Sequence, residues 1–187
     1  AMNVSVSALV ARRRGEKNQR SANQILLVAI LFVIVATVVI SSACVMWANE
    51  IINFCGSAPE THEPAVIYYR IIMGCMIFNV LSMVINAAQR GSGNTMIAMR
   101  TNIVSNVVNI IANYLLIQGH LGFPALGIAG AAIATVFGTV IACIMSFASL
   151  FRRDGFVSIY YIMEQQIRPA LEPAISIIKL GFSVFIE

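Results

Sequence analysis

Long apolar stretches alternate along the chain with short segments that hold most of its charged residues. Four of the stretches are long enough to cross a membrane, since roughly 20 helical residues, each rising about 1.5 Å, span about 30 Å of hydrocarbon. They are residues 25–47, 65–88, 101–117 and 127–150. The pattern predicts four complete transmembrane helices.

The two ends of the chain are apolar but shorter than a membrane span. Residues 2–11 and 175–187 each cover about half of the required length. We expect the first to be the tail of one membrane helix and the second to be the start of another, so that the chain is part of a longer protein. Residues 2–11 do not resemble a signal peptide, because the arginines follow the apolar stretch instead of preceding it.

Composition excludes a soluble enzyme. Of the 187 residues, 59% are hydrophobic and 11% are charged, whereas soluble domains average about 45–50% and about 25%. No Asp, Glu, Lys or Arg occurs in residues 21–49, 71–89 or 101–151. A soluble helical domain has to solvate one face of each helix, so it cannot leave such long segments uncharged.

Basic residues predict the orientation in the membrane. The five successive loops contain five, zero, two, zero and three Lys or Arg residues: Arg12, Arg13, Arg14, Lys17 and Arg20 in the first, Arg90 and Arg100 in the third, and Arg152, Arg153 and Arg168 in the fifth. The positive-inside rule therefore predicts that loops one, three and five are cytoplasmic. The net charge of +4 then faces anionic lipid, and no nucleic-acid partner is needed to explain it.

Four asparagines form a polar stripe in the third predicted span. Asn102, Asn106, Asn109 and Asn113 occupy relative positions 0, 4, 7 and 11 and fall within about 60° of one another around a helix. Amides are costly in hydrocarbon, so the stripe has to face other helices or a hydrated cavity. Two interpretations remain open: interhelical hydrogen bonds, each worth about 0.6–2 kcal/mol, or a solvated site for an ion or substrate.

Small residues recur at every fourth position of the fourth predicted span. Gly130, Ala134, Gly138 and Ala142 form a ridge that lets another helix approach closely, and we expect it to serve packing. Thr135 lies beside this ridge. Its hydroxyl is expected to bond the carbonyl four residues earlier, with an inward orientation as the alternative.

No catalytic or metal-binding set is evident. The four cysteines form no C-x-x-C pair, and His62 and His120 are isolated in loops. The segment 90–95 lacks the third glycine of a dinucleotide loop and the Gly-Lys-Ser/Thr of a phosphate loop. We expect no enzymatic activity, no metal and no cofactor.

Several segments together resemble the multidrug and toxic compound extrusion (MATE) transporters. Residues 3–15, with Asn3, Ser-Ala-Leu-Val-Ala and Gly15, are similar to the end of their second helix. Residues 90–95, Arg-Gly-Ser-Gly-Asn-Thr, resemble their turn between helices four and five. Residues 109–119 and 122–135 resemble helices five and six, and 179–181, Lys-Leu-Gly, resemble the start of helix seven.

The resemblance implies an all-α, polytopic transmembrane bundle that corresponds to helices two to seven of a twelve-helix transporter. Residues 1–169 would belong to the N-terminal lobe with its cytoplasmic linker, and residues 170–187 would begin the C-terminal lobe. The implied protein is a monomeric, multi-pass plasma-membrane antiporter. It would export cationic, lipophilic drugs or metabolites in exchange for protons or sodium ions.

The resemblance also implies which residues act. Asn109, Asn113 and Thr135 would form the ion- or proton-coupling site of the first lobe, and Glu187 matches a glutamate of helix seven. Asn102 and Asn106 are cavity-lining candidates on the same helix face. Many members carry an aspartate at the position of Asn113, so a protonatable group is absent here.

Two alternatives remain open. The first is a flippase of lipid-linked sugars from the same superfamily, which should carry several cavity-facing arginines, whereas only Arg70 and Lys179 fall in or beside a predicted span. The second is a non-transporting scaffold subunit of the membrane.

Overall fold

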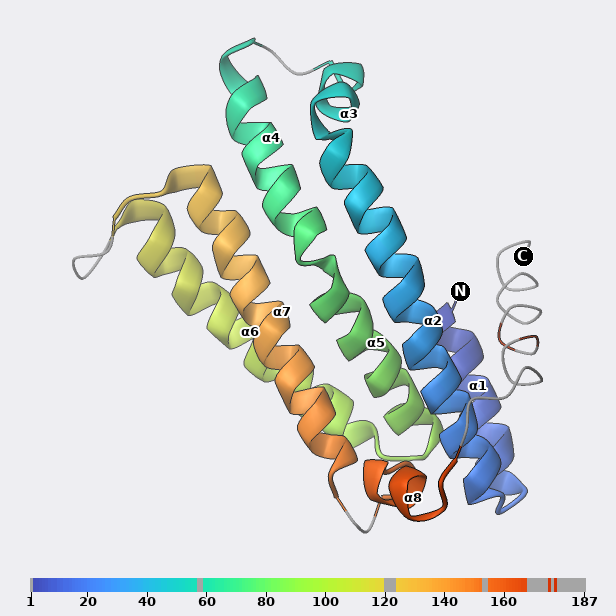
Figure 1. Ribbon diagram of the computed structural model, residues 1–187. Coiled ribbons are helices and arrows are strands. Elements are labelled where there is room, and N and C mark those ends of the chain that lie inside the picture. The colour runs from blue at the N-terminus through green and yellow to red at the C-terminus, as the bar shows by residue number, and fades with distance from the viewer. Residues whose placement is uncertain are drawn as a thin grey trace. The chain divides into compact units, whose positions relative to one another are not determined.

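The computed structural model describes residues 2–56, 59–119, 124–152 and 155–167, together with Ile175 and Ile177. Within these residues the regular secondary structure is entirely α-helical, as predicted (Figure 1). The helices are α1 (Met2–Gly15), α2 (Gln19–Met46), α3 (Ala48–Phe54), α4 (Pro59–Gly74), α5 (Met76–Gly91), α6 (Thr95–Gln118), α7 (Gly127–Leu150) and α8 (Ile159–Glu164).

The chain divides into two compact units. Unit 1 comprises residues 1–34, 80–101 and 143–187, and unit 2 comprises residues 35–79 and 102–142. Helices α2, α5, α6 and α7 run through both units. The three loops that we predict to be cytoplasmic all belong to unit 1, and the two that we predict to be external belong to unit 2.

The helices only partly match the four predicted spans. By length and composition, α2 and α7 can each cross a membrane, and α4 with α5 can form a third span that is bent by 42°. Helix α6 contains 24 residues, but its asparagines lower its mean hydropathy, and it is not among the helices apolar enough to qualify. The crossing of residues 101–117 therefore stays a prediction.

The continuous helix predicted over residues 65–88 is wrong, because the helix breaks at Cys75. Gly74 is the last residue of α4, and glycine is less favourable than alanine in a helix by roughly 0.5–1 kcal/mol. After the break the Phe78 N–H donates to the Cys75 carbonyl at 3.2 Å. Ser41 of α2 donates its hydroxyl to the Met73 carbonyl, which meets the requirement that polar backbone groups in a membrane find a partner.

Close contact between α1 and α5 organises unit 1. A Cβ on Gly91 would lie 3.0 Å from the Val10 Cβ and closer still to the Ser7 carbonyl oxygen, so glycine permits this approach. Fully buried apolar side chains from four helices fill the interior of the unit, among them Val6, Val10, Leu26, Val84, Ile85 and Leu150.

Asn23 ties the segment before α8 to α2. Its side chain is fully buried, and its Nδ2 donates to the carbonyls of Gln19 at 2.9 Å and Phe156 at 3.1 Å. Its Oδ1 accepts from the Ser158 N–H at 3.0 Å. One amide thus fixes where the chain turns back after α7.

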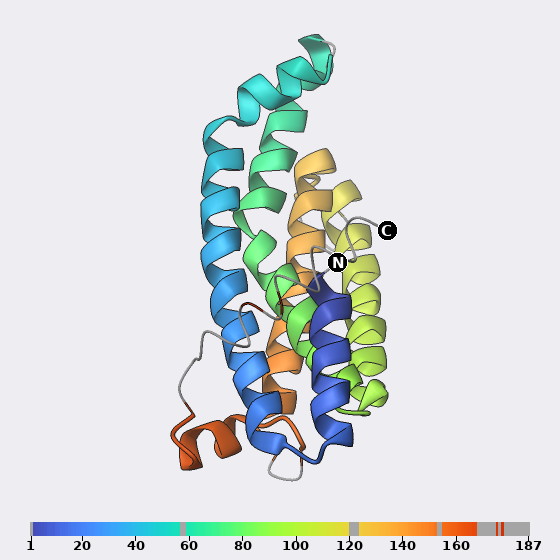
Figure 2. The ribbon, with the colours of Figure 1, turned by 90° about the vertical axis from the view of Figure 1, so that its right-hand side faces the viewer.

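Helices α6 and α7 lie side by side in unit 2 (Figures 1 and 2). The predicted ridge packs against α6: a Cβ on Gly130 would lie 2.8 Å from the Leu116 carbonyl carbon, and a Cβ on Gly138 would lie 3.0 Å from the Ser105 carbonyl oxygen. Ser105 also donates its hydroxyl to the Gly138 carbonyl at 2.8 Å. The expected packing role of the ridge is confirmed.

Candidate functional site

A directed chain of side-chain hydrogen bonds connects α6 and α7 in unit 2. Asn113 Nδ2 donates to Asn109 Oδ1 at 3.0 Å. Asn109 Nδ2 donates to Thr135 Oγ1 at 3.4 Å, and the Thr135 hydroxyl donates to the Ala131 carbonyl at 2.9 Å. The structure therefore brings together three of the four residues that the family resemblance implies.

This series of hydrogen bonds leaves an unused acceptor at its Asn113 end. Asn109 and Asn113 are both half-buried. Asn109 Oδ1 is occupied by Asn113, whereas the described residues provide no donor for Asn113 Oδ1. An amide oxygen carries two lone pairs, and amide and hydroxyl oxygens are ligands that hard cations accept. Asn113 Oδ1 and the remaining lone pair of Thr135 Oγ1 can thus bind a small cation or receive a proton donor.

The asparagine stripe separates into two parts. Asn109 and Asn113 take part in the hydrogen-bonded chain, which agrees with the interhelical interpretation of that half. Asn102 and Asn106 are exposed, and no hydrogen bond of theirs occurs with another described residue. Thr135 bonds the carbonyl four residues earlier, as expected from its sequence position.

Glu187 and His120 lie outside the described residues. The same holds for Lys179. Within the described part of the chain, no three His, Cys, Asp or Glu side chains are grouped so that they could hold a metal ion.

A second polar cluster, in unit 1, was missed by the sequence analysis. Ser146 donates to Asn86 Oδ1 at 3.2 Å, and Asn86 Nδ2 donates to Ser82 Oγ at 3.4 Å. One turn further along, Gln89 Nε2 donates to Ser149 Oγ at 3.0 Å. These side chains are buried. The sequence does carry a signal for this cluster. Ser82, Asn86 and Gln89 lie at positions i, i+4 and i+7 of α5, and Ser146 and Ser149 lie at positions i and i+3 of α7.

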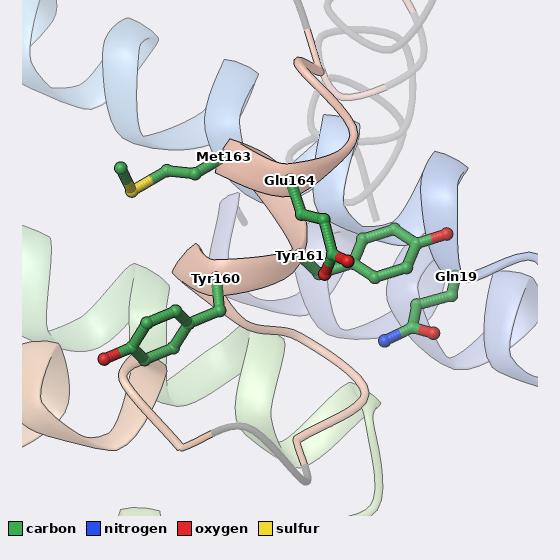
Figure 3. A pocket seen from close by; sticks show the side chains of 5 residues that line it. All are labelled: Gln19, Tyr160, Tyr161, Met163 and Glu164. Atoms are coloured by element: carbon green, nitrogen blue, oxygen red, sulfur yellow. The ribbon is translucent and has the colours of Figure 1, made fainter.

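Unit 1 also contains an open cavity of about 610 Å³ beside α8. Figure 3 shows the side chains of Tyr161 and Glu164 close to that of Gln19 from α2, whereas Tyr160 and Met163 point away from them. One carboxylate and two phenols provide neither a paired acid–base set nor a group of metal ligands. This cavity therefore adds no candidate for catalysis.

Comparison with known proteins finds a matching family model and several proteins with similar sequences. The family model described as MatE matches residues 1–115. The "Probable multidrug resistance protein NorM" of Thermotoga maritima is 26% identical over 189 residues, which cover 100% of this chain and 39% of that protein. A protein with the same description from Rhizobium meliloti is 32% identical over 133 residues, which cover 71% of this chain and 28% of that protein.

Solved structures show the same relationship. An inward-facing multidrug resistance MATE family transporter of the MOP superfamily matches with a TM-score of 0.86 and 25% identity, covering 97% of this chain and 40% of that one. The chain thus spans about two fifths of the length of the relatives it matches. The family model and these alignments show that the chain belongs to the MatE family, as a multi-pass helical protein of the plasma membrane.

Proposed function

We propose that the protein containing this chain is a membrane antiporter that exports cationic, lipophilic compounds in exchange for protons or sodium ions. Family membership supports transport rather than catalysis, and several relatives bear the description "Probable multidrug resistance protein". The substrate is then a small molecule that reaches the protein within or across the bilayer, and the transporter is monomeric.

The proposal assigns residues 1–169 to the N-terminal lobe with its linker and residues 170–187 to the start of the second lobe. Transporters of this type move by rocking of largely rigid bundles. The chain resembles an inward-facing transporter with a TM-score of 0.86 and an outward-facing one with a TM-score of 0.83. Such similar folds in both states support a lobe that moves as a body.

The observation that carries the proposal is the hydrogen-bonded chain from Asn113 through Asn109 to Thr135. None of these groups titrates at physiological pH, so they can coordinate a cation or orient a protonated acid but cannot carry a proton. We assign proton or ion exchange to a carboxylate, either Glu187 or an acid elsewhere in the full-length protein. A carboxylate in a membrane span is costly when ionised unless a cation accompanies it, and this requirement couples its charge to ion binding.

Dye efflux from vesicles under an imposed proton or sodium gradient tests the proposal in the full-length protein. Asn113→Leu removes the donor to Asn109 and the free acceptor. Losing a hydrogen-bond partner typically costs about 1–3 kcal/mol, so we expect ion-driven efflux to fall roughly five- to 150-fold. Membrane insertion should persist because Leu is favourable in hydrocarbon.

Asn79→Leu is the matched control, because Asn79 is an exposed asparagine of unit 2 that lies outside the chain of hydrogen bonds. Glu187→Gln should flatten the dependence of efflux on pH or sodium if this carboxylate exchanges the ion. Unchanged efflux and unchanged ion dependence in both Asn113→Leu and Glu187→Gln would leave the asparagines as structural bonds and refute the assignment.

A further inference from the structure

A small cavity lies between the charged ends of α6 and α7, within unit 1. Its volume is about 240 Å³, below the roughly 300–1,000 Å³ of pockets that enclose drug-sized ligands. Helix α6 contributes Ile97, Arg100 and Thr101, and α7 and the residues after it contribute Met145, Ala148, Ser149 and Arg152. The size favours a compact group over a transported drug.

Two arginines from different helices line this cavity. The Arg100 and Arg152 residues are exposed, and neither pairs with an acid within the part of the chain that the structure describes. Arg12 and Arg13, by contrast, both bind Glu16, at 3.1 and 2.6 Å. Two guanidinium groups that line one small cavity without an acid partner among the described residues repel each other, and an anion between them would offset this repulsion.

A buried hydroxyl at the cavity has no partner. Thr101 is 1% exposed, and its Oγ1 makes no hydrogen bond with any described residue. Helical threonines usually bond a carbonyl of the preceding turn, as Thr135 and Thr139 do here. Buried polar groups without partners are rare, and rotation of the Thr101 side chain would turn this hydroxyl toward the cavity that the residue lines.

The rest of the lining is apolar and indicates a lipid. Ile97, Met145 and Ala148 lie beside the two arginines, so the cavity offers hydrocarbon contacts and a positive charge together. Guanidinium groups match phosphate through paired hydrogen bonds. The cavity belongs to the unit that carries the three predicted cytoplasmic loops, and the cytoplasmic leaflet is rich in anionic lipid.

We propose that this cavity binds the headgroup phosphate of an anionic phospholipid, with Arg100 and Arg152 binding the phosphate and the Thr101 hydroxyl turning toward the cavity to donate to one of its oxygens. The acyl chains then extend along Ile97 and Met145. Bound lipid holds the ends of α6 and α7 together at the membrane surface. This site is separate from the Asn113–Thr135 chain and does not depend on the transported substrate or the coupling ion.

Native mass spectrometry of the purified full-length protein, titrated with phosphatidylglycerol and with phosphatidylcholine, tests the site. A basic residue near an anionic surface contributes an interaction that corresponds to roughly a fivefold change in affinity. We expect Arg100→Gln and Arg152→Gln each to weaken phosphatidylglycerol binding about fivefold and the double variant roughly 25-fold. Phosphatidylcholine binding should stay unchanged.

A charge-matched double variant, Lys17→Gln with Arg20→Gln, is the control. It removes the same two charges from the same unit without touching the cavity, so specific phosphatidylglycerol binding should survive. Equal loss in this control would show that diffuse surface charge attracts the lipid, and retention of the lipid by the Arg100/Arg152 variant would show that it binds elsewhere. Either result overturns the proposal.

Thr101→Val provides a second, independent measurement. It removes a buried hydroxyl that lacks a partner, so the protein in phosphatidylcholine should melt at the same or a higher temperature, while phosphatidylglycerol binding should weaken severalfold. A hydroxyl with a purely structural role would change melting without changing lipid affinity. Displacement of phosphatidylglycerol by millimolar inorganic phosphate would identify a free-anion site and refute the lipid assignment.

Discussion

Replacing Gly130 with alanine should separate α6 from α7. The new Cβ would lie 2.8 Å from the Leu116 carbonyl carbon and closer to its oxygen, where ordinary contact begins near 3.4 Å. The obstructing atoms are backbone, so no side-chain rotation relieves the overlap. The helices have to part by roughly 0.6 Å or more, which also strains the 2.9 Å hydrogen bond from the Leu126 N–H to the Leu116 carbonyl.

The expected loss of stability follows from these contacts. Overpacking costs about 1–3 kcal/mol, and the weakened hydrogen bond adds about 1 kcal/mol. Alanine recovers about 0.5–1 kcal/mol through its lower chain entropy in the unfolded state. Gly130→Ala should therefore destabilise the protein by about 1–3.5 kcal/mol, which corresponds to a melting temperature roughly 2–14 °C lower for a folded body of 150–250 residues.

Alanine substitutions at two other glycines of unit 2 serve as controls for the stability change of Gly130→Ala. A Cβ on Gly138 would lie 3.0 Å from the Ser105 carbonyl oxygen, so its neighbours have to yield only by a few tenths of an ångström. We expect Gly138→Ala to change stability by less than about 1 kcal/mol. A Cβ on Gly74 meets nothing within 4 Å, so Gly74→Ala should be neutral or slightly stabilising.

Thermal unfolding of the full-length protein can be followed with a thiol-reactive dye, using a background in which Cys143 is the sole cysteine. Cys143 is 6% exposed and becomes reactive when α7 separates from its neighbours. The predicted order of melting temperatures is Gly130→Ala lowest, then Gly138→Ala, then Gly74→Ala. If Gly130→Ala melts as high as Gly74→Ala, the close approach at Leu116 does not exist and the reasoning fails.

Three further predictions concern other parts of the chain. Gly93→Ala should lower the melting temperature because Gly93 has φ +80° and because the new Cβ would displace the Arg14 guanidinium. Gly93→Asn displaces Arg14 as well but should cost less, since asparagine tolerates this backbone region; equal effects would argue against backbone strain. Asn86→Leu should cost about 1–3 kcal/mol by leaving buried serines without their amide partner, in contrast to a near-neutral Asn79→Leu in the same melting assay. In intact cells, an impermeant thiol reagent should label the exposed Cys55 from outside but not a cysteine at Lys17; the reverse pattern would overturn the predicted topology.

Features that depend on one helix and its periodicity could be predicted from the sequence. The four-residue recurrence of Gly130, Ala134, Gly138 and Ala142 predicts a packing face, and the structure places α6 against it. The hydrogen bond from Thr135 to the carbonyl four residues earlier follows from helix geometry alone. Each of these features is fixed by residues within a few turns of one another.

Features that depend on a second helix could not be predicted. The break at Cys75 is stabilised by a hydrogen bond from Ser41 to the Met73 carbonyl, 32 residues further along the chain, and nothing in the sequence near Gly74 predicts that partner. The cluster of Asn86 with Ser146 joins residues that are 60 positions apart. In the sequence, isolated serines in apolar helices indicate only small residues that a membrane helix can accommodate. The hydrogen-bond network becomes visible only when α5 and α7 are placed side by side.

Both proposed binding sites are distinguished from structural bonding by unused hydrogen-bonding capacity rather than by polarity. In unit 1 the Ser82, Asn86 and Ser146 side chains are buried and satisfy one another, so a ligand would have to break bonds that already exist. Asn113 Oδ1 in unit 2 and Thr101 Oγ1 in unit 1 have no donor or partner among the described residues. Leaving such groups unbonded in a protein interior is costly, and under our two proposals the cost is recovered when an ion or a protonated acid binds at Asn113 and a phosphate binds at Thr101.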